Sequence, residues 1–254
     1  MKRHAAQLLL WAVAAASAQT APETRRSGFL DMGPATQALQ QDDSLNPAAL
    51  WLKDGEQRFS TACSTCHTSS RSTNNLRGVA ARYPVWDARL GKPITLAARI
   101  NQCQVQQVKG AAFAAESQAL LSLEVFVAQQ SRGLPLSPPT DATSVRQLAP
   151  YRAEGERLFR QRFGQLDFSC AQCHDQHAGG RLAGSTIPQG HATGYPIYRL
   201  EWQGLGSLQR RLRGCMTGVR AEPFAYGSDE LTALELYLMQ RAAGLLLETP
   251  AVRP

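Results

Sequence analysis

The cysteine pattern is the feature of this chain that most clearly indicates chemistry. Residues 63–67 read Cys-Ser-Thr-Cys-His, and residues 170–174 read Cys-Ala-Gln-Cys-His. This spacing is typical of c-type haem attachment, because the two thiols add to the vinyl groups and the following imidazole binds one face of the iron. Paired redox-active or zinc-binding Cys-x-x-Cys elements are the competing interpretation. The pattern predicts two covalently attached haem c groups, held by Cys63, Cys66, His67, Cys170, Cys173 and His174.

Cys103 and Cys215 are the two cysteines that lie outside these signatures. Between Cys66 and the Pro-rich segment that begins at residue 134, the sequence has no methionine and no histidine other than His67. Cys103 is therefore the one soft donor available for the second axial position of the first iron. A thiolate there donates electron density, stabilises ferric iron and lowers the reduction potential.

The two unassigned cysteines occupy equivalent positions of an internal repeat. A Tyr-Pro pair precedes each of them, Cys103 and Cys215, by 20 residues. By this equivalence, Cys215 is predicted to bind the second iron as Cys103 binds the first. Segments ahead of each signature and at the end of each unit also match: 51–59 with 151–159, and 123–133 with 234–244.

Three alternatives compete with thiolate ligation of the second iron. Met216 is a conventional ligand next to Cys215, although its counterpart in the first unit is Gln104. His191 is far enough from the second signature to reach the opposite haem face. A disulfide between Cys103 and Cys215 is the ordinary use of two spare cysteines in an oxidising compartment, although it would link equivalent positions of two domains.

The repeat predicts a mainly α fold, with two tandem cytochrome c-like domains related by internal duplication and preceded by an N-terminal extension. Each opening helix carries an aromatic residue and, four residues later, a glycine, so that one face can receive a closely packed helix. The last helix is expected to begin near Ser228, a good N-cap, and to end near Arg241. Its buried face is expected to contain Leu231, Leu234 and Leu238.

Composition shifts and the repeat together set the expected boundaries. The N-terminal extension shows no clear periodicity, and we expect it to wrap the first domain or to contact a partner. A Pro-rich stretch separates the two units. The boundaries are signal peptide 1–18, N-terminal extension 19–45, first haem domain 46–134, linker 135–148 and second haem domain 149–248.

The first residues predict export to the bacterial periplasm. Lys2 and Arg3 precede an apolar stretch, and residues 16–18 read Ala-Ser-Ala, a small-residue cleavage site that places the mature start near Gln19, after Ala18. The apolar stretch is too short to span a bilayer and no long apolar run follows, so no membrane span is expected in the mature protein. Retention of the leader as an uncleaved anchor is the alternative.

The formal net charge of +7 suits anionic small molecules or an acidic protein partner. Nucleic acid is not expected, because the arginines gather beside a cysteine and form no long stripe with interleaved aromatics. Arg211 lies four residues before Cys215, as Arg99 lies before Cys103, so each shares a helical face with its cysteine. A guanidinium there favours thiolate and can hold an oxyanion with paired donors. A solvated basic surface is the competing interpretation for the cluster of Arg210, Arg211, Arg213 and Arg220.

Residues 209–216, together with 219–223, 227–228 and 234–237, resemble the SoxA family, the dihaem subunits of the SoxAX cytochromes of bacterial sulfur oxidation. The resemblance covers nearly all of the mature chain and is most specific around Cys215. It implies an L-cysteine S-thiosulfotransferase, an enzyme that oxidatively joins thiosulfate to a cysteine of the sulfur carrier SoxYZ and passes two electrons to haem. It also implies a separate monohaem partner, SoxX.

The resemblance further implies roles for individual residues. Cys215 is implied as both iron ligand and active-site residue, and Arg211 as a residue that handles the substrate; we also expect Arg220 to bind substrate. Two other functions stay open, a thiosulfate dehydrogenase that forms tetrathionate and a non-enzymatic dihaem electron carrier. The implied axial ligands are His67, Cys103, His174 and Cys215.

Overall fold

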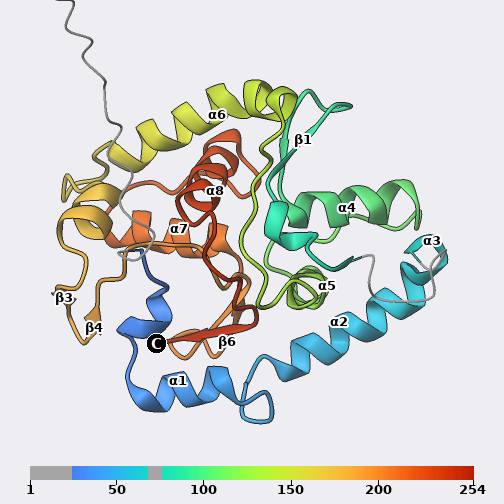
Figure 1. Ribbon diagram of the computed structural model, residues 1–254, viewed down its shortest axis with the longest axis horizontal. Helices are drawn as coiled ribbons and strands as arrows, with labels where there is room; N and C mark the ends of the chain where they lie inside the picture. Colours follow the sequence, from blue (N-terminus) through green and yellow to red (C-terminus); the bar gives the residue numbers. More distant parts are fainter. Residues whose placement is uncertain (1–24, 68–75) are drawn as a thin grey trace, which may run out of the picture.

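The computed structural model describes residues 25–67 and 76–254 (Figure 1). The predicted signal peptide lies outside the described residues. The first part of the chain forms an N-terminal extension and one helical unit that contains a short hairpin. Its elements are η2 (Gly28–Asp31), α1 (Pro34–Gln41), α2 (Ala49–Ala62), α3 (Ser64–His67), η4 (Ala80–Arg82), β1 (Val85–Asp87), β2 (Lys92–Ile94), α4 (Leu96–Gln106) and α5 (Gln118–Gln129).

The second unit repeats this plan and ends in an additional strand. Its hairpin pairs antiparallel, and the last strand adds to it in parallel, giving a three-stranded sheet in the order β6-β5-β7. No helix within the described residues is long and apolar enough to cross a membrane. The elements are α6 (Ala142–Arg160), the π-helical turn η5 (Gln172–Gln176), β3 (Arg181–Leu182), β4 (Ser185–Thr186), β5 (Ile197–Arg199), β6 (Gly204–Gly206), α7 (Leu208–Gly218), α8 (Asp229–Arg241) and β7 (Ala251–Arg253).

The duplication seen in the sequence is present in the structure. The elements β5, β6 and α7 each begin 112 residues after their counterparts β1, β2 and α4, and each has the same length as its counterpart. Cys103 lies in α4 and Cys215 in α7, at the same step of the repeat. The predicted mainly α fold with two related units is therefore confirmed.

Each unit closes by packing its first helix against its last, at a glycine. A β-carbon on Gly55 of α2 would lie 1.9 Å from the carbonyl oxygen of Ser122 in α5. A β-carbon on Gly155 of α6 would lie 2.1 Å from the carbonyl oxygen of Ala233 in α8. Both positions leave no space for a side chain, so the two helix pairs cross at backbone contact distance, as the aromatic and glycine spacing predicts.

The two units pack against each other around an approximate two-fold axis. Trp51 of α2 makes an edge-on contact with Tyr198 of β5, with ring centroids 5.9 Å apart. Tyr151 of α6 contacts Trp86 of β1 at 6.2 Å, which is the same contact with the two units exchanged. One cluster of core side chains also includes Ala242 and Leu247 of the second unit among residues of the first. The two units therefore share a hydrophobic core and are not independent domains joined only by a linker.

The last helix agrees closely with the sequence. The side chain of Ser228 accepts a hydrogen bond from the backbone N–H of Leu231, so α8 begins with the expected cap. Leu231, Leu234 and Leu238 are all buried. In this element the predicted bounds and the predicted buried face are both confirmed.

The predicted linker 135–148 is only partly extended. The Asp141 side chain accepts a hydrogen bond from the Ser144 backbone N–H and caps α6, so the helix begins at Ala142. The second half of this stretch is therefore helical, and α6 continues through Pro150 into the repeat. The cap decides the start of the helix because its carboxylate satisfies an N–H that the helix leaves unpaired.

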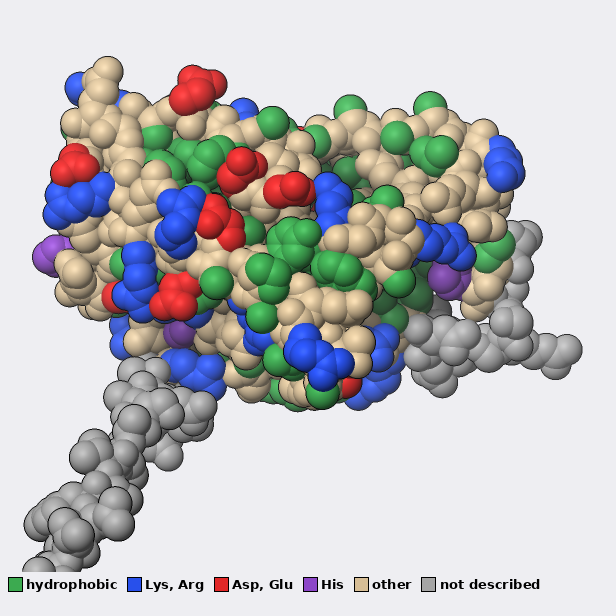
Figure 2. Space-filling model, turned by 90° about the horizontal axis from the view of Figure 1, so that it is seen from above, with side chains coloured by type: hydrophobic (Ala, Val, Ile, Leu, Met, Phe, Trp, Pro, Cys, Tyr) green, Lys and Arg blue, Asp and Glu red, His purple; other side chains and the backbone are tan. Residues whose placement is uncertain are grey.

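The N-terminal extension packs mainly on the second unit, whereas the sequence analysis expected the first domain or a partner. Helix α1 lies beside β7, near the C-terminus in Figure 1. The Gln40 side chain accepts a hydrogen bond from the Val252 backbone N–H, and Asn46 donates to the Pro250 carbonyl. On the face shown in Figure 2, basic, acidic and apolar side chains are interspersed.

Candidate active site

The second haem signature is fixed by a pair of reciprocal hydrogen bonds. The Ser169 hydroxyl accepts from the Gln172 backbone N–H, and the Gln172 side chain accepts from the Ser169 backbone N–H. This arrangement closes the turn at both ends, as in a capping box. It orients the side chains that follow the turn, which are Cys170, Cys173 and His174.

The imidazole of His174 is oriented for metal binding. Its Nδ1 lies 2.7 Å from the Pro188 carbonyl oxygen, which can only accept, so Nδ1 donates there and Nε2 is the nitrogen left to face a metal. Gly190 packs against the same ring, since a β-carbon there would lie 3.0 Å from its Cγ. His191 follows directly and is held by the Arg26 carbonyl at 2.8 Å. His191 therefore lies on the same side as the Pro188 loop and does not oppose His174.

The thiol of Cys215 faces His174 from helix α7 and forms a hydrogen bond with it. Burial raises the pKa of this thiol, but the bond to His174 and the charges of Arg211 and Arg199 outweigh burial, so the pKa lies below its usual value. The same neighbourhood acts on Cys170, whose pKa burial and the Cys215 thiol raise to about 12. Cys215, His174 and the signature thiols therefore converge on one place.

This donor set fits a c-type haem. An imidazole with a free Nε2 on one side, a thiol on the other and two signature thiols beside them are the groups that attachment and axial ligation require. Met216 is the next residue of α7 and is turned away by about 100° along the helix, into a buried position. All six cysteines lie within the described residues and none is in a disulfide, so the alternative of a Cys103–Cys215 disulfide is not formed in this structure.

In the first unit, Cys103 likewise lies near a cysteine of the haem signature. The thiol of Cys103 in α4 lies close enough to Cys63 to act on it: burial first, then the thiols of Cys103 and Cys66, raise the pKa of Cys63. The ring of His67 contacts Phe59 at 5.6 Å between centroids. All five residues of this signature, 63–67, lie within the described part of the chain.

The arginines that the sequence gathered around Cys215 have different surroundings. Arg210 stacks over Trp202 at 4.3 Å, and Arg213 stacks over Tyr226 at 4.5 Å, so both are used in packing. Arg220 lies past the end of α7 with an exposed side chain and a φ of 59°. Among the arginines, Arg211 is the one whose charge lowers the pKa of Cys215 most.

Arg199 of β5 is the residue near Cys215 that the sequence analysis missed. Its charge acts on Cys215 and on Arg211. A single arginine in a three-residue strand gives no periodic signal. The repeat register is the signal that could have found it, because Arg199 lies 16 residues before Cys215, as Asp87 lies before Cys103.

Known proteins share this architecture over most of the chain. A family model described as the SoxA/TsdA cytochrome c domain matches residues 47–136 and 154–247, one match for each unit. The chain belongs to the SoxA/TsdA cytochrome c family. Haem c is therefore its cofactor, and the SoxA resemblance drawn from the sequence is confirmed.

The relatives that match over the full fold are SoxA proteins. The L-cysteine S-thiosulfotransferase subunit SoxA of Pseudaminobacter salicylatoxidans is 33% identical over 89% of this chain and 80% of the relative. The subunit of that name from Paracoccus pantotrophus is 32% identical over 91% of this chain and 80% of its own. The crystal structure of SoxXA from P. pantotrophus matches with a TM-score of 0.84 and 31% identity, over 91% of this chain and 87% of that chain.

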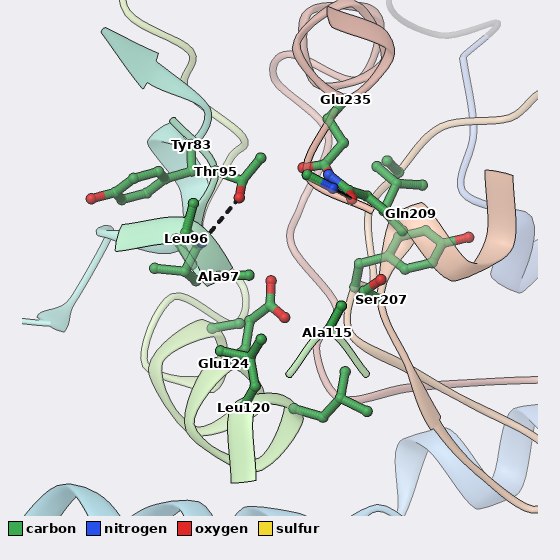
Figure 3. Close-up of a pocket in the computed structure, with 18 of the residues that line it drawn as sticks. Tyr83, Thr95, Leu96, Ala97, Ala115, Leu120, Glu124, Ser207, Gln209 and Glu235 are labelled. Atoms are coloured by element: carbon green, nitrogen blue, oxygen red, sulfur yellow. Dashed lines mark hydrogen bonds between the residues drawn. The ribbon is translucent and has the colours of Figure 1, made fainter. Parts of the chain in front are cut away.

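A cavity of about 270 Å³ lies between the two SoxA/TsdA units. Figure 3 shows Glu124 of α5 and Glu235 of α8, equivalent residues of the repeat, reaching toward it from opposite units. Burial, followed by the charges of Glu235 and Glu116, raises the pKa of Glu124 to about 8. Burial raises the pKa of Glu235 to about 7, against a hydrogen bond from Gln209 that lowers it. The junction of the units therefore holds two carboxyl groups that stay protonated well above their usual range.

Glu124 and Glu235 make the free energy of unfolding depend on pH. In the unfolded chain both carboxyls lose their protons near pH 4.5, whereas in the folded protein they keep them to about pH 7 and 8. Unfolding in this window releases protons, so the free energy of unfolding falls as pH rises. We expect Glu124→Gln to gain about 1–2 kcal/mol over the parent protein at pH 8 and little at pH 5, measured by urea denaturation.

The matched control is Glu56→Gln, which removes an exposed carboxylate of α2. It should leave the difference in stability between pH 5 and pH 8 as it is in the parent protein. If Glu124→Gln and the parent protein lost the same amount of stability between pH 5 and pH 8, the pH dependence would not come from this cavity.

Proposed function

We propose that this chain is the SoxA-type subunit of an L-cysteine S-thiosulfotransferase. It joins thiosulfate to a cysteine of a SoxYZ-type carrier in the bacterial periplasm. The observation that carries the proposal is the Cys215 thiol, which faces His174 across the second signature and lies beside the guanidinium of Arg211. The names of relatives that match about 90% of this chain support the same reaction.

The proposal includes two covalently attached haem c groups. Cys63 and Cys66 would hold the first and Cys170 and Cys173 the second. When bound, haem supplies an acceptor for the electrons that leave as two sulfur atoms join. The proposed axial donors are His67 and Cys103 in the first unit, and His174 and Cys215 in the second.

Arg211 would hold the sulfonate of thiosulfate through paired N–H donors and so direct its outer sulfur to Cys215. Arg220, at the exposed end of α7, would act as an outer cation that attracts the dianion. The lowered pKa of Cys215 favours the thiolate that bonds to the outer sulfur.

The reaction balances in two steps. The thiolate of Cys215 and the outer sulfur of thiosulfate would form one S–S bond, a two-electron oxidation for which bound haem would supply the acceptor. The carrier thiolate then attacks the outer sulfur, the new S–S bond breaks, and Cys215 leaves as thiolate. The carrier keeps a cysteine S-thiosulfonate.

A SoxX-like monohaem cytochrome is the proposed partner that takes electrons onward. The support for this partner is the match to a SoxXA complex over 91% of this chain. The proposed export, with cleavage after Ala18, agrees with the need of this chemistry for an oxidising compartment.

The test is a reconstituted assay with haem-loaded protein, thiosulfate, a SoxYZ-type carrier and an electron-accepting cytochrome. We expect the carrier to gain the mass of one thiosulfate group on its cysteine, and we expect no gain with a carrier whose thiol is blocked. Tetrathionate formed without a carrier would instead support a thiosulfate dehydrogenase. Electron exchange without either product would support a dihaem electron carrier.

A further inference from the structure

The repeat places opposite charges at one position of its two copies. Strand β1 ends at Asp87 and strand β5 ends at Arg199, 112 residues later. Arg99 and Arg211 are likewise equivalent, each four residues before the unassigned cysteine of its unit. The same two positions therefore hold an acid and a base in the first unit and two bases in the second.

In the first unit this pair is neutral and closed. Arg99 forms an ion pair with Asp87 at 2.8 Å, and the Asp87 side chain is only 3% exposed. Asp87 also accepts hydrogen bonds from the backbone N–H groups of Arg89 and Leu90, which help to lower its pKa. An added anion would have to break this buried pair to reach Arg99, at considerable cost.

In the second unit the equivalent pair consists of two cations beside one thiol. The side chain of Arg199 is 13% exposed and is held in place by a bond from its Nε to the carboxyl group of Pro254 and by contact with Trp202 at 5.1 Å. Burial and the charge of Arg211 lower its pKa, but a guanidinium stays protonated. Two like charges are therefore gathered around Cys215.

The negative charge near Arg199 neutralises only part of the positive charge of Arg199 and Arg211. Glu201 pairs with Arg199 at 2.7 Å, but its side chain is 64% exposed, and an exposed ion pair contributes little. Within the described residues, Arg211 forms no ion pair with a carboxylate. Two partly buried cations whose acidic partners, Glu201 and the carboxyl group of Pro254, are exposed favour the binding of a dianion, which relieves their repulsion.

We infer that Arg199 and Arg211 together bind the substrate anion, with Arg199 as a positioning residue that selects dianionic sulfur oxyanions. This inference rests on the proposed function and deepens it. The position that holds Asp87 in the first unit holds Arg199 in the second. The structural ion pair of the first unit is therefore replaced by an anion site in the unit that carries Cys215. Thiosulfate is the ligand that the proposed reaction supplies.

Arg199→Gln is the first test, with haem-loaded protein in the carrier assay. We expect KM for thiosulfate to rise about tenfold or more, because one charge-assisted contact to the anion is lost. We expect kcat to change less than about threefold, and KM for the carrier and the haem absorption spectrum to stay the same. Arg199→Lys should restore part of the affinity, since it keeps the charge and loses the planar fork.

A second variant separates anion binding from support of the sheet. Arg199→Asp recreates the pairing of the first unit by giving Arg211 a carboxylate, and should abolish thiosulfate binding measured by calorimetry on the oxidised protein. Glu201→Gln removes the competing carboxylate and should lower KM for thiosulfate about twofold. The charge control is Arg146→Gln, on the exposed surface of α6, which should leave KM unchanged.

An unchanged KM and an unchanged calorimetric affinity in Arg199→Gln would overturn the inference. So would a loss of affinity that is matched by a loss of folding stability and is not rescued by Arg199→Lys, since that is the result of a purely structural role. Both outcomes leave conjugation by the parent protein intact and so spare the proposed function. A parent protein that modifies no carrier would instead refute the proposed function itself.

Discussion

Replacing Cys215 by methionine should lower kcat/KM for thiosulfate conjugation about a thousandfold or more while haem stays attached. A thioether has no proton to lose and forms no disulfide with the outer sulfur of thiosulfate, although it keeps a sulfur atom that faces His174. The measurement is the mass of the carrier after reaction with Cys215→Met. Haem content is followed in parallel by the pyridine haemochrome spectrum.

The matched control is Met216→Leu, a volume-conserving change at the next residue of the same helix, whose side chain is buried. It should retain conjugation and the spectrum of the parent protein. Full turnover by Cys215→Met would contradict the assigned role of the thiol. A changed spectrum in Met216→Leu alone would make the thioether the ligand of the second iron.

Gly155→Ala should destabilise the second unit by about 3 kcal/mol. The new methyl group would lie 2.1 Å from the Ala233 carbonyl oxygen and 2.8 Å from the Tyr237 side chain. Helices α6 and α8 would have to separate, which opens the core between them. Urea denaturation monitored by circular dichroism measures the change in the free energy of unfolding.

Gly214→Ala in α7 is the control for the chemical change itself. Among the described residues, nothing beyond its own turn of helix lies within 4 Å of the position of its β-carbon, so alanine should add about 0.5–1 kcal/mol of stability through its better helix propensity. Equal stability of Gly155→Ala and the parent protein would refute the account of the α6–α8 crossing.

The features that the sequence predicts well are local or repeated. The cap of α8 at Ser228 is read from a few neighbouring residues, and the equivalence of Cys103 and Cys215 is read from the spacing of the two copies. The second half of the predicted linker 135–148 is helical, because the Asp141 side chain caps α6 at Ala142. Local signals of this kind need no knowledge of what packs against them.

The features that the sequence does not predict arise where distant segments meet. Glu124 and Glu235 line a cavity whose walls come from both units, so their burial depends on how the two units pack. His191 was an open alternative as an iron ligand because spacing alone does not tell on which side of His174 the loop returns. The contact of the N-terminal extension with β7 is also non-local, since Gln40 and Val252 lie at opposite ends of the chain.

The contact between α1 and β7 also bears on the order of events during folding. Asn46 and Pro250 are 204 residues apart in the sequence, and Gln40 and Val252 are 212 residues apart. Closing so long a loop costs conformational entropy that no local contact repays. We therefore expect the extension to dock late, after the helices of each unit have packed.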